Sequence, residues 1–322
     1  MTENAKSAPT QQSSTPSRTV ANKAGDDLQI PVVRTNHYNF DIWHIAVAEG
    51  PIMPDDELTK LSETLKLKSV PDMVFNDNIF SISFGNADPN LANPSPKMDK
   101  NKPPVFSINF NTEDALGAIE GANYEHVKVA STASWQETRD MAKAPMKDKG
   151  NWTFTTRYQG TLTSFSDSSE STNSLVWKPT EAEIDYARLR DRSKPIMKHE
   201  DIILYEDELD DNGQAQLRLR FRLMQDCFFI LLRFYLRLDD VLVRLVETRL
   251  YCYGGERRII RESCYREFSW NKAMSHPKIG AAGTGPSNPL FNPDMLTHSL
   301  LEDKSLAELL DRDEKKLDEL VW

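Results

Sequence analysis

The chain has 322 residues, a formal net charge of −10 and 39% hydrophobic residues. This acidic balance argues against a protein that binds nucleic acid over its whole surface. No apolar run of about 18 residues is free of charge, so we expect no membrane span. The first residues lack the apolar stretch of a secretory signal. The three cysteines form no CxxC pair, which favours reduced thiols in the cytosol or the nucleus.

The N-terminal segment, residues 1–36, is rich in Ser, Thr, Pro, Gln and Lys and has no aromatic residue. Such a composition cannot bury a core, so we predict a disordered tail. A folded domain is predicted over residues 37–270. A loop insertion rich in Pro, Asn and Lys interrupts this domain at residues 86–104.

Strands are predicted wherever apolar and polar residues alternate, and helices wherever apolar residues keep helical spacing after a capping residue. We expect helices from Pro54 to about Leu65 and from Thr180 to about Arg192. The early strands are predicted, in chain order, at 38–47, 73–75, 79–84, 105–110, 126–130 and 152–160. With no alternation of strand and long helix, the sequence favours one α+β domain built on a large, mainly antiparallel sheet with a few short flanking helices.

The stretch from Glu206 to Tyr251 contains the clearest strand pattern. Arginines at 218, 220 and 222 alternate there with leucines and a phenylalanine, as in a half-buried strand. Asn212-Gly213 just before this strand predicts a hairpin, because that pair adopts the positive φ angles of a tight turn.

A second hairpin is predicted from Cys227 to Tyr251 around a two-residue turn, Asp239-Asp240. That turn would pair Leu238 with Val241 and so divide the hairpin into two faces. The predicted core face comprises Ile230, Leu232, Phe234, Leu236, Leu238, Val241, Val243 and Leu245. The predicted opposite face comprises Phe229, Leu231, Arg233, Tyr235, Arg237, Leu242, Arg244 and Val246.

The C-terminal part begins with a strand predicted from Arg257 to about Phe268. Residues 271–322 are rich in Gly, Pro, Asn and charged residues. We predict a flexible tail that carries an amphipathic helix over 299–321. That helix would dock on the domain, remain disordered or bind a partner.

Catalytic motifs are absent from the sequence: it has no GxGxxG, P-loop, GxSxG or HExxH pattern. The acidic run from Glu206 to Asp211 fails the calcium-loop pattern, because the twelfth position counted from Asp207 is Arg218. Among the histidines, only His37 and His44 fall close together. We therefore expect no enzyme, no cofactor and no metal site.

The arginines of the two hairpins form a cationic sheet face in this prediction. One interpretation is a solvent-facing ladder paired to Asp and Glu across the strands. A second is a groove that accepts a carboxylate or an acidic peptide, since arginine offers a two-pronged donor. Nucleic acid would need stacked aromatic residues beside the cations, and Tyr235 is the only one in place.

Several long blocks resemble the TIPRL family, the TOR-signalling-pathway regulator-like proteins. They are LKSVPDMVFNDN at 67–78, WQET at 135–138, WTFTTRYQGTL at 152–162, LYEDELDDNG at 204–213 and FFILLRFYLRLDDVLVRLVETRLY at 228–251. The blocks occur in order over about Asn39 to Glu267. The tails and the 86–104 insertion fall outside the resemblance.

The resemblance implies a non-enzymatic regulator in TOR signalling, located in the cytoplasm or also in the nucleus. It would bind the catalytic subunits of type 2A-like serine/threonine protein phosphatases as a regulator or inhibitor. The family's cleft receives the phosphatase's C-terminal tail. An alpha-four-type phosphatase-associated protein is a second implied partner. The alternative left by the residues alone is a nucleic-acid or acidic-ligand module.

Contact positions follow from the resemblance. Asp114 and Ile184 match the family residues, Leu245 stands where relatives often carry Met, and Ser263 stands where they carry Tyr. Tyr265, two residues further on, lies on the same strand face and could replace that Tyr. With the cationic face, the candidate partner-binding residues are Asp114, Ile184, Leu245, Ser263, Tyr265, Arg233, Tyr235, Arg237 and Arg244.

Overall fold

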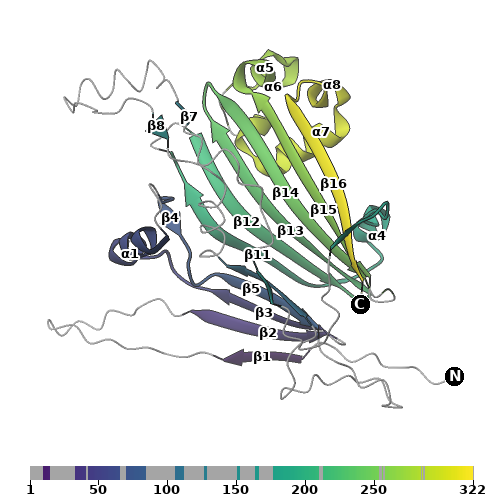
Figure 1. Ribbon diagram of the computed structural model, residues 1–322. Coiled ribbons are helices and arrows are strands. Elements are labelled where there is room, and N and C mark those ends of the chain that lie inside the picture. Colours follow the sequence, from purple (N-terminus) through teal and green to yellow (C-terminus); the bar gives the residue numbers. More distant parts are fainter. Residues whose placement is uncertain are drawn as a thin grey trace.

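The computed structural model describes part of the chain. The described residues are 10–14, 33–40, 43–65, 70–84, 106–111, 127–128, 151–152, 164–166, 177–209, 213–253, 256, 258–283, 285 and 287–321. Asp114, the insertion at 86–104 and most of the predicted strand at 152–160 lie outside these ranges. The described residues form two large antiparallel sheets with short helices around them (Figure 1).

The smaller of the two large sheets is built from the N-terminal half. Its six strands, in spatial order, are β1 (Thr10–Ser14), β2 (Arg34–Phe40), β3 (Trp43–Glu49), β5 (Ile79–Phe84), β6 (Phe106–Asn111) and β9 (Ser164–Ser166). Strand β1 falls in the segment predicted to be a disordered tail, where it pairs with β2. Helix α1 (Asp55–Leu65) follows β3 as predicted, with three acidic residues in its first turn that favour the helix dipole. A separate pair, β7 (Val127–Lys128) and β8 (Asn151–Trp152), completes this half.

The larger sheet has eight strands. In spatial order they are β10 (Lys178–Pro179), β16 (Arg312–Val321), β15 (Arg258–Ser269), β14 (Leu242–Tyr253), β13 (Cys227–Leu238), β12 (Gly213–Met224), β11 (Ile196–Asp207) and β4 (Met73–Val74). All neighbouring strands are antiparallel, which confirms the predicted fold class. Gly213 opens β12 where a Cβ atom would overlap the backbone oxygen of Arg237, so glycine is required there.

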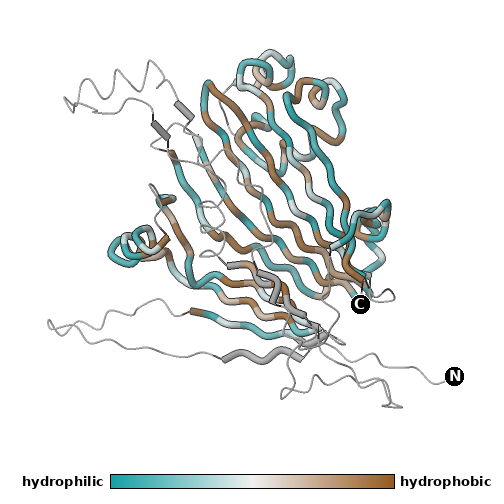
Figure 2. The backbone as a smooth tube through the Cα atoms, viewed as in Figure 1, coloured by the Kyte–Doolittle hydropathy of each residue, from teal (hydrophilic) through white to brown (hydrophobic). Residues whose placement is uncertain are grey.

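The two sheets pack face to face around one hydrophobic core. We call the face of the larger sheet that carries Leu217, Leu219 and Phe221 the inner face, and the face that carries Arg218, Arg220 and Arg222 the outer face. The inner face packs on the smaller sheet, as shown by the ring pair Phe80–Phe221 at 5.0 Å between centroids. Apolar residues are accordingly concentrated on the central strands (Figure 2).

The β13–β14 hairpin has a different register from the predicted one. Three residues, 239–241, connect the strands, and Asp240 has a positive φ of 64°. Leu238 therefore pairs with Leu242 rather than Val241. A shift of one residue turns every β14 side chain to the other face. The prediction that Arg244 shares a face with Arg233 and Arg237 is wrong, and so is the placing of Val243 and Leu245 on the face of Phe234.

The C-terminal region is packed on the larger sheet, so the prediction of a flexible tail from residue 271 is wrong. It forms α5 (Trp270–Ser275), α6 (Pro277–Gly280), η1 (Pro289–Phe291), α7 (Pro293–Glu302) and α8 (Lys304–Ala307) before β16. These helices cover one end of the outer face (Figure 1) and bury Val243, Leu245 and Phe268. The register shift explains this cover, because it turns those apolar side chains outward.

The predicted helix over 299–321 is also wrong in its second half, since residues 312–321 form strand β16. Leu317 and Leu320 have helical spacing, which made the segment look helical. Charge pairing across the strands favours the strand instead: Arg261 bonds Asp318 at 2.7 Å, and Lys315 lies 2.9 Å from Glu262.

The other end of the outer face is covered by α4 (Tyr186–Arg190), which is shorter than the helix predicted from Thr180 to Arg192. Its N-cap is Asp185, whose carboxylate accepts from the Arg188 backbone N–H, while Thr180 lies before the helix, directly after β10. Below α4, Ile184 and Leu189 pack with Tyr251 and Ile260. The outer face is thus covered at both ends, with a stretch of polar sheet between.

Candidate functional site

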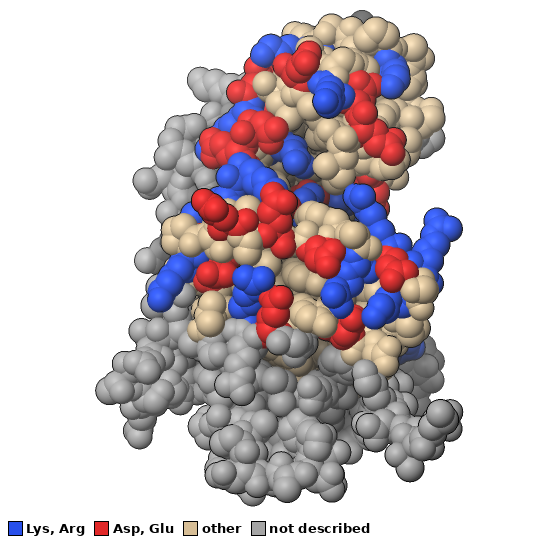
Figure 3. Space-filling model, turned by 90° about the vertical axis from the view of Figure 1, so that its right-hand side faces the viewer, with Lys and Arg blue, Asp and Glu red and all other residues tan. Residues whose placement is uncertain are grey.

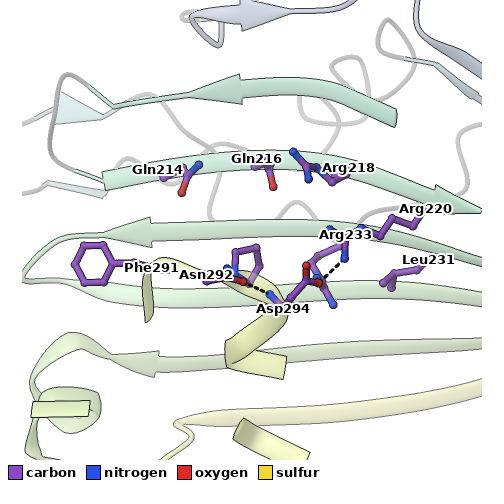
Figure 4. A pocket seen from close by; sticks show the side chains of 10 residues that line it. Gln214, Gln216, Arg218, Arg220, Leu231, Arg233, Phe291, Asn292 and Asp294 are labelled. Carbon is purple, nitrogen blue, oxygen red and sulfur yellow. Dashed lines mark hydrogen bonds and ion pairs between the residues drawn. The ribbon is translucent and has the colours of Figure 1, made fainter. Parts of the chain in front are cut away.

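The candidate site is a pocket on the outer face, which we call the arginine pocket. Its volume is about 180 Å³, and it lies between the sheet and the segment that joins η1 to α7 (Figure 4). Figure 3 shows the molecule from the right-hand side of Figure 1. An indentation lies below a rounded upper lobe, and Lys and Arg side chains lie beside Asp and Glu side chains along it (Figure 3). The pocket is lined by Gln214, Gln216, Arg218, Arg220, Leu231, Arg233, Phe291, Asn292, Pro293 and Asp294.

Strand alternation and register bring the basic side chains of the pocket together. Arg218 and Arg220 are separated by one residue on β12, so both point to the outer face. Arg218 pairs with Arg233 across β12 and β13, which places a third guanidinium beside them. The period-two pattern of the sequence therefore predicted this cluster correctly, except for Arg244.

An acidic side chain of the chain itself already contacts this cluster. Asp294, in the first turn of α7, forms ion pairs with Arg220 and Arg233. Burial alone would raise the pKa of Asp294, but the hydrogen bonds from these two arginines outweigh burial and hold it below its usual 3.8. The exposed fraction of the Asp294 side chain is 48%, against 9% for Arg233. The guanidinium is therefore fixed in the sheet, whereas the carboxylate reaches in from solvent.

Arg218 and Arg220 also contact carboxylates of the neighbouring strand β11. Arg218 lies 3.5 Å from Asp201 and 3.7 Å from Glu206, and its buried Nε atom has no hydrogen-bond partner in the described part of the chain. Arg220 also donates to Asp201 at 3.0 Å. A ladder of arginines paired to acids across the strands is thus present, and the pocket opens beside it.

Arg233 is held in place by a buried network of charged residues on the neighbouring strands β14 and β15. Its Nε donates to Glu247 at 2.8 Å, Arg249 donates to the other Glu247 oxygen and to Glu262, and Tyr186 donates to Glu262 at 2.8 Å. Burial raises the pKa of Glu247, but the charges of Arg249 and Arg233 more than compensate and leave it below the usual 4.5. The network fixes the Arg233 side chain before any ligand binds, which lowers the entropic cost of binding.

Two other predicted residues of this strand lie under the C-terminal helices. Tyr235 is 1% exposed and donates its hydroxyl to the backbone oxygen of Leu290. Arg237 donates to Asp239 at 2.7 Å and lies over the Phe291 ring at 4.0 Å. Since Tyr235 is covered, it cannot stack on a base, and the nucleic-acid alternative loses the aromatic on which it depended.

The residues that the family resemblance singled out are spread over the two faces of the sheet. Ile184 is buried below α4, and Leu245 is buried below the C-terminal helices. Ser263 and Tyr265 lie on the inner face, where Arg244 pairs with Glu267 and lies over the Tyr265 ring at 5.4 Å. Asp114 lies outside the described residues.

Several residues of the site were missed by sequence reasoning. Asp294 is the most important, and a signal for it existed. Asn292-Pro293-Asp294 has an N-cap residue, a proline at the first helical position and an acid in the first turn. Recognising that helix start would have shown that the segment is folded and that its acid is available to pair with arginines.

The described part of the chain shows neither a metal-binding cluster nor a reactive thiol. Within it, no three or more His, Cys, Asp or Glu side chains are arranged to hold a metal ion. Burial raises the pKa of the thiols of Cys227 and Cys264 to about 11 and of Cys252 to about 12, which makes all three poor nucleophiles at neutral pH. No helix among the described residues is long and apolar enough to cross a membrane.

The fold and the pocket have the features of a binding protein: a rigid antiparallel scaffold, fixed guanidiniums and an accessible polar pocket. Residues 96–274 match the TIP41-like family. The chain is 35% identical over 246 residues to the TIP41-like protein of Rattus norvegicus, covering 74% of this chain and 80% of that protein. It is 35% identical over 244 residues to the one of Homo sapiens, covering 74% and 79%.

The fungal relatives carry more explicit names. The chain is 28% identical over 267 residues to the type 2A phosphatase activator TIP41 of Saccharomyces cerevisiae, covering 78% of this chain and 68% of that protein. The chain belongs to the TIP41-like family, which confirms the family predicted from the sequence.

Proposed function

We propose that this chain is a non-enzymatic regulator that binds the catalytic subunit of type 2A-like serine/threonine phosphatases and acts in TOR signalling. Family membership supports the regulatory role, together with the name "type 2A phosphatase activator" of the relatives from Saccharomyces cerevisiae and Schizosaccharomyces pombe. The word activator differs from the inhibitory action considered from the sequence. The proposal extends to an alpha-four-type second partner and to a location in the cytoplasm or also in the nucleus.

The arginine pocket is the feature that carries the binding proposal. A chain-terminal carboxylate accepts two parallel hydrogen bonds from a guanidinium, and Arg218, Arg220 and Arg233 converge on the pocket. The amides of Gln214 and Gln216 can bond the peptide backbone of a tail. Leu231 and Phe291 offer apolar contacts for its last side chain. The pocket therefore suits the end of a polypeptide, which is what the phosphatase's C-terminal tail would supply.

Binding of a tail would require an exchange of carboxylates. The incoming carboxylate would compete with Asp294 for Arg220 and Arg233. Because the Asp294 side chain is half exposed, it can turn into solvent at little cost. Arg233 remains in place because Glu247 holds its Nε.

The test compares the full chain binding to the intact catalytic subunit and to one that lacks its C-terminal tail. Removing the tail should weaken binding about tenfold or more, since a charge-assisted pair is lost. Arg218→Glu with Arg220→Glu should weaken binding of the intact subunit but leave the tail-deleted subunit unaffected. The matched control reverses the charge of two exposed lysines that do not line the pocket, Lys60→Glu with Lys304→Glu.

Two results would refute parts of this proposal. Equal affinity for the two forms of the subunit would exclude the carboxylate role of the pocket. No measurable binding of either form would exclude the phosphatase as the direct partner. Phosphatase activity measured in the same samples on a phosphopeptide decides whether the bound regulator activates or inhibits.

A further inference from the structure

A second hollow lies on the outer face, next to α4 and the turn that leads from α4 into β11. We call it the α4 hollow. Its volume is about 670 Å³, and its basic residues are Arg190, Arg192, Lys194 and Arg222, with Asp191 as its only acid. It is shared neither with the arginine pocket nor with the predicted contact residues. Arg222 follows Arg218 and Arg220 on β12, so the two sites lie along the same strand.

The α4 hollow differs from the arginine pocket in that its arginines have no acidic partners. Arg190, Arg192 and Arg222 form no ion pair with a carboxylate of the described residues; Arg222 donates only to the backbone oxygen of Leu189, at 3.2 Å. Lys194 is paired with Asp226 at 3.1 Å. The Asp191 carboxylate accepts from the Ser193 N–H and hydroxyl at 2.9 and 2.7 Å, so it is used within its own turn.

This concentration of unpaired positive charge is unusual among the described residues. The protein as a whole carries a net charge of −10 and would repel an acidic ligand over most of its surface. By contrast, Arg233 and Arg249 of the outer face are paired with the buried carboxylate of Glu247. The unpaired guanidiniums of Arg190, Arg192 and Arg222 would therefore attract an acidic ligand to the α4 hollow.

The lining also has an apolar part. Ile196 is 51% exposed at the start of β11, and Pro195 precedes it in the same hollow. No aromatic side chain is among the residues that line the hollow, so there is no platform on which a nucleic-acid base could stack. The size of the hollow exceeds what a single carboxylate or phosphate ion would fill. Charge and shape together favour a peptide segment with acidic residues next to an apolar one.

We propose that the α4 hollow is a second binding site, which takes an acidic segment of a partner protein. Carboxylates of the segment bond Arg190, Arg192 and Arg222, and a neighbouring apolar side chain packs on Ile196. The site goes beyond the proposed phosphatase contact, because it requires neither a chain terminus nor a phosphatase. It makes the outer face a surface with two separate acid-accepting positions.

The test measures the affinity of a fluorescent acidic peptide by anisotropy, using the full chain. The probe is an N-acetylated, C-amidated octapeptide of glutamate and leucine, and the amide removes the terminal carboxylate that the arginine pocket would select. Arg190→Glu with Arg192→Glu should weaken its binding about tenfold or more. Both side chains are exposed, so folding should be preserved, as checked by an unchanged urea midpoint. The Lys60→Glu, Lys304→Glu chain, with the same net charge, should bind like the wild type.

Each outcome decides the proposal. Selective loss in the Arg190/Arg192 variant, with weakening by added salt and with Arg218→Glu plus Arg220→Glu unaffected, supports the site. Equal loss in the lysine control shows that net charge alone drives binding and overturns it. No binding of the peptide to the wild type at low salt overturns it as well. Tighter binding of single-stranded oligouridylate than of the peptide would assign the hollow to nucleic acid instead. None of these results depends on whether a phosphatase binds the arginine pocket.

Discussion

Replacing Glu247 by alanine is the most direct test of the network below the arginine pocket. The Glu247 side chain is fully buried and accepts hydrogen bonds from Arg233 and Arg249, and Arg266 lies 3.9 Å away. Alanine removes the carboxylate that lies between these guanidiniums. Of its carboxylate partners, Arg233 then keeps only the half-exposed Asp294, and Arg249 keeps Glu262.

The cost can be estimated from these contacts. Removing one partner of a buried ion pair costs about 3–5 kcal/mol, because the other charge stays buried without compensation. Since both arginines retain a second carboxylate, we expect the lower end, about 3 kcal/mol. That loss is a large part of the roughly 5–15 kcal/mol by which a protein is usually stable.

Urea unfolding of the full chain at pH 7, followed by tryptophan fluorescence, measures this loss as a lower midpoint. The control is Glu302→Ala on α7, because Glu302 pairs with His298 at 3.1 Å but is 67% exposed. An exposed pair of this kind should change stability by about 0.5 kcal/mol or less. A loss below about 1 kcal/mol for Glu247→Ala would show that the network does not hold the pocket in place.

Three further predictions follow from the same contacts. Asp294→Asn should tighten binding of a peptide with a free terminal carboxylate several-fold by anisotropy, because it removes the competing acid; unchanged affinity would contradict the exchange. The folded-state pKa values of Glu247, Glu262 and Asp294 are depressed, so the stability they contribute is complete above about pH 4.5 and is lost as the pH falls through the folded values. Urea midpoints should therefore fall from about pH 4.5 downward, and less steeply for Glu247→Gln; a parallel fall would refute this assignment. Gly213→Ala should destabilise by more than about 1 kcal/mol, since its Cβ meets the Arg237 oxygen; an unchanged midpoint would show that β12 shifts freely.

The sequence was most informative where alternation is strict. Arg218, Arg220 and Arg222 lie on one face as predicted, because period two leaves a strand no other choice. The neighbouring hairpin was misplaced by one residue because turn length depends on the backbone of Asp240, whose positive φ no apolar pattern encodes. That single residue moved Arg244 to the inner face and Leu245 to the outer one.

In the C-terminal region, the local sequence pattern predicted the wrong secondary structure. Strand β16 is rich in charges, and its two leucines have helical spacing, so local pattern favours a helix. Its strand form depends on partners distant in sequence, such as Arg261 for Asp318 and Glu262 for Lys315. The α4 hollow was invisible for the same reason, since Arg190 and Arg222 become neighbours only through the fold.

The position of Asp294 at the start of α7 has a thermodynamic consequence for the C-terminal helices that cover the outer face. Ligand and helix compete for the same two guanidiniums, so each reduces the apparent affinity of the other by the same factor. Occupancy of the arginine pocket should therefore be readable at a distance, as faster amide exchange in the first turn of α7. The C-terminal helices would then report whether a ligand is bound, as well as cover the sheet.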